Sequence, residues 1–243
     1  MNTIKISSRL LRGIFLSILV SVPLWGTPDA GRYLREQDFD VAKMIPVAPT
    51  NDSLQTKVDL EVVRQVQERR RPEQVALARY FAHDTVFQYG DIIGPWITAD
   101  KLPVTAAFFD QIHEDRYAIS SQGKRVWNRP RPPLLDSNIH VCVPLPKSGS
   151  YPSGHSTQAF VWAGLLAEIF PEHRAELRDR AALVAWSRII GGVHYPSDIV
   201  SGRMLGDQLV KEFLKVPDLQ KDLTAVREEV AQFETEALAE AVN

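Results

Sequence analysis

Residues 155–170 carry apolar side chains on nearly every side of a helix, and this run constrains the fold more than any other segment. Its apolar core is made of Phe160, Val161, Ala163, Leu165 and Leu166, and Pro171 ends it. A helix without a polar face has to be covered by other elements. The sequence therefore predicts a central helix buried among neighbouring helices.

The neighbouring segments supply helices to surround it. We expect helices over residues 103–126, 172–190 and from 196 onward, and an outer charged helix over 217–241. In the first of these, Ala107, Phe108, Ile112 and Tyr117 should share one buried side. The sequence shows no alternation of apolar and polar residues typical of a β-strand, and it contains no clear internal repeat. The predicted fold class is all-α, a helical bundle with the active site at the ends of central buried helices.

The N-terminus has a different character. Lys5, Arg9 and Arg12 precede the apolar run 13–25, as in a secretory signal peptide, and the run is short for a membrane span of about 20 residues. We expect a signal peptide over residues 1–30, cleaved between 25 and 31, then an irregular arm over 31–55, and one domain over 56–243. An uncleaved anchor or a buried helix is the alternative for residues 1–30.

Composition narrows the class of function. The formal net charge of −2 and the 24% of charged residues are ordinary for a globular protein. A binder of nucleic-acid polymers usually presents a basic surface, so this class is disfavoured. The single cysteine, Cys142, cannot form an intrachain disulfide. Any anion site must therefore be a local positive pocket.

Three short motifs predict such a pocket, and the first two of them supply groups that bind anions. Lys124 stands seven residues before Arg131, and together an ammonium and a guanidinium can grip the oxygens of one phosphate. Ser153 and Gly154 offer a hydroxyl and an accessible backbone N–H at the start of the central helix, where anions bind favourably. These groups predict a phosphate-binding site.

The histidines add reactive groups. His155 follows Gly154, and the third motif, SRIIGGVHYPSD, carries Arg188, His194 and Asp198. A carboxylate four residues after a histidine can accept from one ring N–H and leave the other nitrogen able to attack. The spacing favours His194 as the nucleophile, but it does not by itself decide between the two histidines.

In this order, the motifs K-x6-R-P, P-S-G-H and S-R-x5-H-x3-D resemble the phosphatidic acid phosphatase type 2 superfamily, which includes the vanadium haloperoxidases. The run GSYPSGHS, the length and the N-terminus are similar to the class A bacterial non-specific acid phosphatases. The resemblance covers residues 44–230, most strongly 120–215.

This resemblance implies roles for individual residues. His194 would become phosphorylated, Asp198 would orient it, and His155 would protonate the leaving alcohol. The phosphoryl oxygens would be held by Lys124, Arg131, Ser153, Gly154 and Arg188. No cofactor and no metal is expected. The leaving group is expected near the loop 132–151 and the helix around residues 90–110.

The implied protein is a periplasmic or secreted, vanadate-sensitive acid phosphatase. It would act on phosphomonoesters, nucleotides included, with phosphotransfer to alcohols as a side reaction. The resemblance leaves a homo-oligomer open, and we expect no stable membrane insertion, because charged residues interrupt every later apolar run.

Three other functions are compatible with some of these residues. A vanadate-dependent haloperoxidase would use the same motifs, usually in a much longer chain. A non-catalytic periplasmic anion-binding protein would need neither histidine. A zinc or iron site on His155, His194 and Asp198 is disfavoured, because three nearby cations would repel a metal ion.

Overall fold

The structure is a computed structural model that describes residues 31–83 and 85–242. The predicted signal peptide lies outside the described residues. Helices make up the regular structure of the described chain, as the all-α prediction requires, and none of it forms a β-strand. The α-helices are α1 Val41–Met44, α2 Leu54–Arg69, α3 Pro72–Tyr80, α4 Gly90–Ile93, α5 Pro103–Trp127, α6 Pro132–Leu135, α7 Gly154–Ile169, α8 Arg174–Ile190, α9 Pro196–Phe213 and α10 Pro217–Val242.

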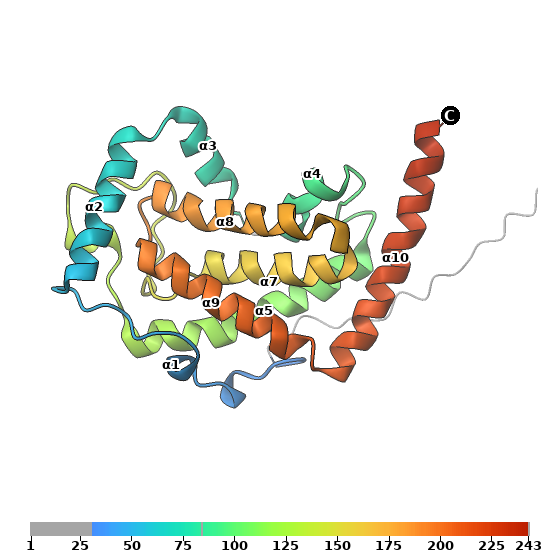
Figure 1. The fold of residues 1–243 in the computed structure, drawn as a ribbon, viewed down its shortest axis with the longest axis horizontal. Coiled ribbons are helices and arrows are strands. Elements are labelled where there is room, and N and C mark those ends of the chain that lie inside the picture. The colour runs from blue at the N-terminus through green and yellow to red at the C-terminus, as the bar shows by residue number, and fades with distance from the viewer. Residues whose placement is uncertain (1–30, 84, 243) are drawn as a thin grey trace, which may run out of the picture.

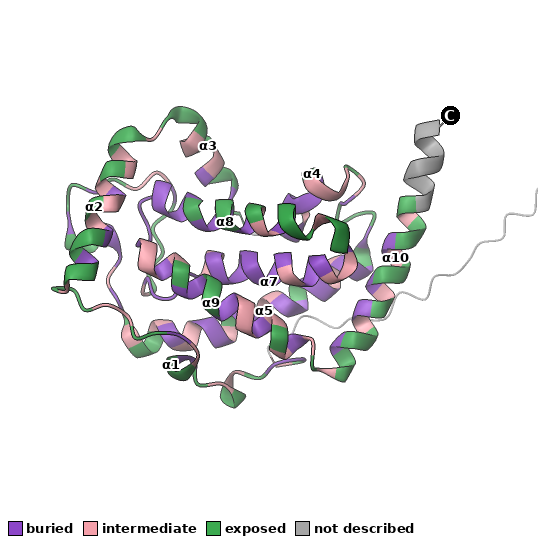
Figure 2. Cartoon of the chain, viewed as in Figure 1, coloured by how far each residue is buried: buried purple, intermediate pink, exposed green. Residues whose placement is uncertain are grey.

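Helix α7 is the centre of the bundle, as its apolar composition predicts. It lies between α8 and α9, and α5 runs along another side (Figure 1). Its residues are buried along most of their length (Figure 2). The Leu165 side chain is fully buried, so its replacement by Ala would destabilise the fold by about 2–5 kcal/mol.

A glycine lets α9 approach the start of α7. A Cβ atom at Gly202 would lie 2.6 Å from the backbone oxygen of Ser153 and 2.8 Å from Cβ of Ser156. No side chain fits at that separation, so the contact requires glycine. It sets the second turn of α9 against the first turn of α7, close to two of the three motifs.

Helix α5 departs from the sequence prediction on one point. Phe108 and Ile112 are buried as expected, but Tyr117 is 56% exposed. Asp115 and Arg116 occupy the buried positions instead. Charged groups can lie there because each has hydrogen-bond partners, which a pattern of apolar residues does not reveal.

The buried Asp115 holds the N-terminal arm. Its carboxylate accepts from the backbone N–H groups of Gly31, Tyr33 and Leu34 at 2.8–2.9 Å. The arm is not wholly irregular, since it contains the 3-10 turn Glu36–Asp38 and the single turn α1. Likewise α6 forms one helical turn within the predicted loop 132–151.

The periphery is completed by α2 and α3 at one end of the bundle and by α10 at the other (Figure 1). Within residues 31–83 and 85–242, no helix offers an apolar stretch long enough to cross a bilayer.

Candidate active site

The predicted site residues come together at one end of the central helices. Lys124 lies in the last turn of α5, and Arg131 immediately precedes α6. Ser153, Gly154 and His155 form the start of α7, and Arg188 lies in the last turn of α8. A turn through Gly192, whose φ is +75°, then leads to His194, and Asp198 follows in the first turn of α9.

His194 is held by groups on both ring nitrogens. Its Nδ1 lies 3.0 Å from Oδ2 of Asp198, and its Nε2 lies 3.1 Å from Nη1 of Arg131. A carboxylate can only accept and a guanidinium can only donate. The geometry therefore assigns the proton to Nδ1, and Nε2 keeps the lone pair that a nucleophile needs.

Burial and charge both keep His194 neutral. Its side chain is 2% exposed, and burial lowers its pKa well below the ordinary 6.5. The nearby cations Arg131, Lys124 and Arg188 lower that pKa further, in that order. A neutral imidazole is the form that attacks phosphorus.

The ionised form of Asp198 is stabilised by Arg129, a residue that was not among the predicted site residues. Burial raises the pKa of this fully buried carboxyl, whereas Arg129 and the N–H of Tyr195 lower it. Nη1 of Arg129 donates to Oδ1 of Asp198 at 2.7 Å, and the Tyr195 N–H donates to Oδ2 at 3.0 Å. Arg129 therefore opposes the desolvation that favours the protonated acid.

The two cations that were predicted to bind phosphate, Lys124 and Arg131, are tied to the loop before α7. Nζ of Lys124 donates to the carbonyls of Gly149 and Pro152 at 3.0 Å each, and Nε of Arg131 donates to that of Ser148 at 2.9 Å. Burial lowers the pKa of Lys124 to about 7, with Arg131 adding to the effect. Burial also lowers the pKa of Arg131 to about 10. A bound dianion would raise both pKa values.

The start of α7 presents backbone to this cluster. The position of a Cβ on Gly154 would be 3.9 Å from Cε of Lys124 and 3.7 Å from Nη1 of Arg116. Ser153 differs from expectation, because its hydroxyl accepts from the N–H of Ser156 at 3.4 Å and caps the helix. It lies beside the cluster but already has a structural partner.

His155 lies in the first turn of α7 and is partly buried. Its Nε2 lies 3.5 Å from the carbonyl oxygen of Ala82, which follows α3. Burial lowers its pKa well below 6.5, and the charges of Arg188 and His194 add to this. A bound phosphate would favour its protonated form, because opposite charges attract.

Sequence reasoning missed the residues behind the motifs. Arg129 stands two positions before Arg131, so a search for paired cations could have included it. Arg116 lies eight residues before Lys124 on α5, on a similar side of the helix, which the helical repeat could have revealed. Asp59 on α2 gave no signal, because nothing links it to the motifs along the chain.

A cavity of about 460 Å³ lies next to Ala82, the residue whose carbonyl oxygen is 3.5 Å from Nε2 of His155. It is lined by Arg79, Ala82, His83, Val141, Cys142, Val143 and Pro144. One wall includes Ala82, whose carbonyl faces His155. The lining also includes Val143, which packs so closely on the turn before His194 that a Cβ at Gly191 would lie 2.8 Å from it. The cavity thus borders the segments that carry both histidines.

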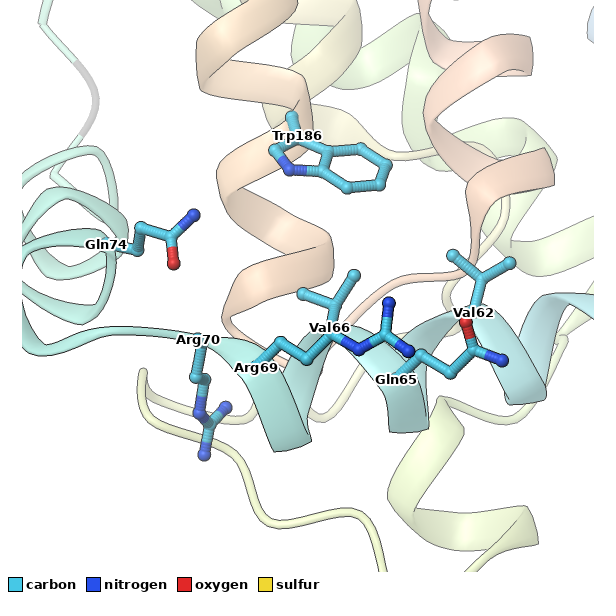
Figure 3. Close-up of a pocket in the computed structure, with 7 residues that line it drawn as sticks. All are labelled: Val62, Gln65, Val66, Arg69, Arg70, Gln74 and Trp186. Carbon is cyan, nitrogen blue, oxygen red and sulfur yellow. The ribbon is translucent and has the colours of Figure 1, made fainter.

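A second hollow, of about 200 Å³, lies between α2, α3 and α8 (Figure 3). Its lining is Val62, Gln65, Val66, Arg69, Arg70, Gln74 and Trp186. None of the eight predicted site residues lines it. Among the described residues, no group of three or more His, Cys, Asp or Glu side chains is arranged to hold a metal ion.

Comparison with known proteins agrees with the motifs. Residues 115–217 match the PAP2 superfamily. An acid phosphatase of Zymomonas mobilis is 31% identical over 56% of this chain and 53% of its own length. A non-specific acid phosphatase of Salmonella typhimurium is 37% identical over 47% of each chain. The resemblance to the bacterial non-specific acid phosphatases is confirmed, although the chain spans only about half the length of these two relatives.

Among solved structures, a bacterial vanadium-dependent iodoperoxidase is similar, with a TM-score of 0.57 and 19% identity over 72% of this chain and 54% of that one. At this identity the likeness supports the fold alone. It agrees with the all-α bundle.

Proposed function

We propose that this chain, whose residues 115–217 match the PAP2 superfamily, is a metal-independent acid phosphatase acting through a phosphohistidine on His194. The observation that carries the proposal is the environment of that ring. Nδ1 faces the Asp198 carboxylate at 3.0 Å, and Nε2 faces the guanidinium of Arg131 at 3.1 Å. A phosphate held by Arg131 would lie next to the attacking nitrogen.

In the first step, Nε2 of neutral His194 forms a bond to phosphorus as the bond from phosphorus to the ester oxygen breaks. Protonated His155 gives its proton to that oxygen, so the alcohol leaves neutral. The ring of His194 takes on positive charge, which the Nδ1–H shares with Asp198.

In the second step, the now neutral His155 accepts a proton from water as the water oxygen attacks phosphorus. The bond between phosphorus and Nε2 breaks, phosphate leaves, and His194 becomes neutral again. An alcohol in place of water would give phosphotransfer. Lys124, Arg131 and Arg188 stabilise the equatorial oxygens in both steps, with the N–H groups at Gly154.

The departing alcohol is proposed to occupy the cavity of about 460 Å³ beside His155. Its walls combine apolar side chains, such as Val141 and Val143, with the imidazole of His83 and the guanidinium of Arg79. This lining suits an organic group with one flat apolar face, and nucleotides are the proposed natural class. The charged and apolar N-terminal sequence supports export to the periplasm or the medium.

The proposal is tested by hydrolysis of p-nitrophenyl phosphate between pH 4 and 9, with EDTA and vanadate in separate arms. We expect activity that resists EDTA and is inhibited by vanadate, since trigonal bipyramidal vanadate mimics the transition state. Activity that EDTA abolishes and a divalent metal restores would contradict it. A protein that is inactive here but oxidises bromide with peroxide in the presence of vanadate would be a haloperoxidase.

A further inference from the structure

We propose that Asp59 on α2 is a positioning residue for His194, acting through Arg129, and that its negative charge is needed to stabilise the phosphorylated ring. The inference rests on the proposed function, because it concerns the charge that His194 acquires during phosphoryl transfer. Asp59 lies outside all three motifs and outside the segment that matches the superfamily.

Arg129 connects the two carboxylates. Its side chain is almost completely buried. Nη1 donates to Oδ1 of Asp198 and to Oγ of Ser197, both at 2.7 Å. Nη2 donates to Oγ1 of Thr56 at 2.9 Å and lies 3.3 Å from Oδ2 of Asp59. One guanidinium therefore joins the first turn of α9 to the first two turns of α2.

The charges of this group do not cancel. Asp198 contributes −1, Arg129 contributes +1 and Asp59 contributes −1, which leaves −1 for the three together. Without Asp59, the Asp198 carboxylate would be matched by Arg129 alone and the sum would be zero. All three side chains are at most 2% exposed, so water screens their charges weakly.

This residual negative charge suits the reaction, because the ring of His194 becomes positively charged when it is phosphorylated. When Nε2 of His194 bonds to phosphorus, the ring becomes cationic and its Nδ1–H faces Asp198 at 3.0 Å. A neutral pair behind Asp198 would offer the cation little attraction, whereas a net negative group stabilises it. Asp59 is thus placed to favour the transition state rather than substrate binding.

Helix α2 is fixed firmly enough for this role. Asp59 also accepts from Nε2 of Gln55 at 2.9 Å and from the hydroxyl of Ser197. At the other end of α2, Arg70 donates to the carbonyls of Ile190 and His140 at 2.9 Å each. The helix is therefore tied to both the start of α9 and the turn before His194.

The test measures the rate of phosphoenzyme formation by rapid quench with p-nitrophenyl phosphate, together with kcat, KM and the melting temperature of the full chain. Asp59→Asn removes the charge and keeps the shape. We expect phosphoenzyme formation to slow about 10- to 100-fold, with KM little changed, because the lost interaction acts mainly in the transition state. Thr56→Val removes a hydrogen bond from the same guanidinium to a neutral hydroxyl, and it should slow phosphoenzyme formation much less.

Asp115→Asn is the matched control, since Asp115 is an equally buried carboxylate that holds the arm. It should lower the melting temperature and leave the rate of phosphorylation unchanged. Asp59→Glu and Asp59→Gln form a second pair of equal length, of which only the charged variant should retain most of the rate. This pair decides the question if Asp59→Asn does not fold.

Two results would overturn the inference. One is a wild-type rate of phosphorylation in Asp59→Asn. The other is an equal loss in Asp59→Glu and Asp59→Gln, which would point to shape rather than charge. Wild-type protein that forms no phosphoenzyme would instead refute the proposed function, so the two failures are distinguishable.

Discussion

The two histidines of the site lie at the ends of neighbouring elements but in different surroundings. His194 is bounded by side chains with fixed charges, Asp198 on one ring nitrogen and Arg131 on the other. His155 is partly exposed, and a backbone carbonyl, that of Ala82, lies 3.5 Å from its Nε2. Charged partners fix which nitrogen of His194 carries a proton, whereas burial lowers the pKa of His155 and a bound phosphate would raise it, so the charge of His155 can change when substrate binds.

In the proposed mechanism, this difference separates the nucleophile from the proton carrier. A nucleophile needs one unprotonated nitrogen throughout, which the environment of His194 provides. An acid that later serves as a base must change its charge within each turnover, and the environment of His155 allows that. The following experiments test how far this contrast holds.

The largest effect is expected from His194→Ala. Because the attacking nitrogen is removed, phosphoenzyme formation should vanish and kcat/KM should fall by about 10⁴-fold or more. Incubation with ³²P-labelled substrate, followed by quenching under alkaline conditions, which preserve phosphohistidine, measures the phosphoenzyme. The rate of hydrolysis of the same substrate gives kcat/KM. Covalent labelling in this variant at the wild-type level would place the nucleophile elsewhere.

His155→Ala should be less damaging and should depend on the leaving group. Hydrolysis of an alkyl phosphate should drop about 10²- to 10⁴-fold, since the alkoxide then leaves without a proton. With p-nitrophenyl phosphate, whose leaving group is already stable, phosphoenzyme should still form. An equal loss of activity with both substrates would contradict the proposed role of His155 as the acid that protonates the leaving group.

The pH dependence of the reaction should report the protonation of His155. Because burial lowers its pKa below 6.5, the protonated acid is lost as the pH rises, and Lys124, with a pKa of about 7, loses its charge next. We expect kcat/KM to be highest on the acidic side and to fall toward pH 8. Bound dianion raises the pKa of His155, so the alkaline limb of kcat should lie at higher pH than that of kcat/KM. The reverse order would contradict this account.

The smallest effect is expected in the cavity beside His155. Cys142 lines it and is the single cysteine in the sequence, so a thiol reagent acts at one position. A bulky label should raise KM severalfold for a nucleotide and leave hydrolysis of a small alkyl phosphate nearly unchanged. Cys142→Ser should be insensitive to the reagent. A uniform loss of kcat with all substrates would argue against a leaving-group site there.

The sequence allowed the helical frame to be predicted because its signals are local. Proline at a helix start and an uninterrupted apolar run act within a few residues, and α5, α7 and α9 begin where these signals occur. The order of the three motifs likewise predicted which residues meet around His194.

The supporting residues could not be predicted in the same way. Asp59 and Ser197 are 138 residues apart, and only the packing of α2 against α9 brings them together. Buried Asp115 and Arg116 were missed on α5 because a charged residue on an apolar face is expected to be excluded unless its partner is known. The leaving group was expected near the loop 132–151 and the helix around residues 90–110. The cavity proposed for it is lined by residues 141–144 of that loop and by residues at the end of α3, which the sequence did not indicate. The position of the leaving group stays a prediction.

The bridge through Arg129 has a consequence for how the chain folds during synthesis. Arg129 and Asp59 are made well before Asp198, and until α9 arrives the pair lacks its third charge and the hydroxyl of Ser197. Burying charges before their partners are present is unfavourable, so this end of the bundle should stay hydrated while the ribosome completes the chain. Docking of α9 would then exclude water from the site and complete it in one event. Few incompletely folded chains would therefore be able to bind phosphate.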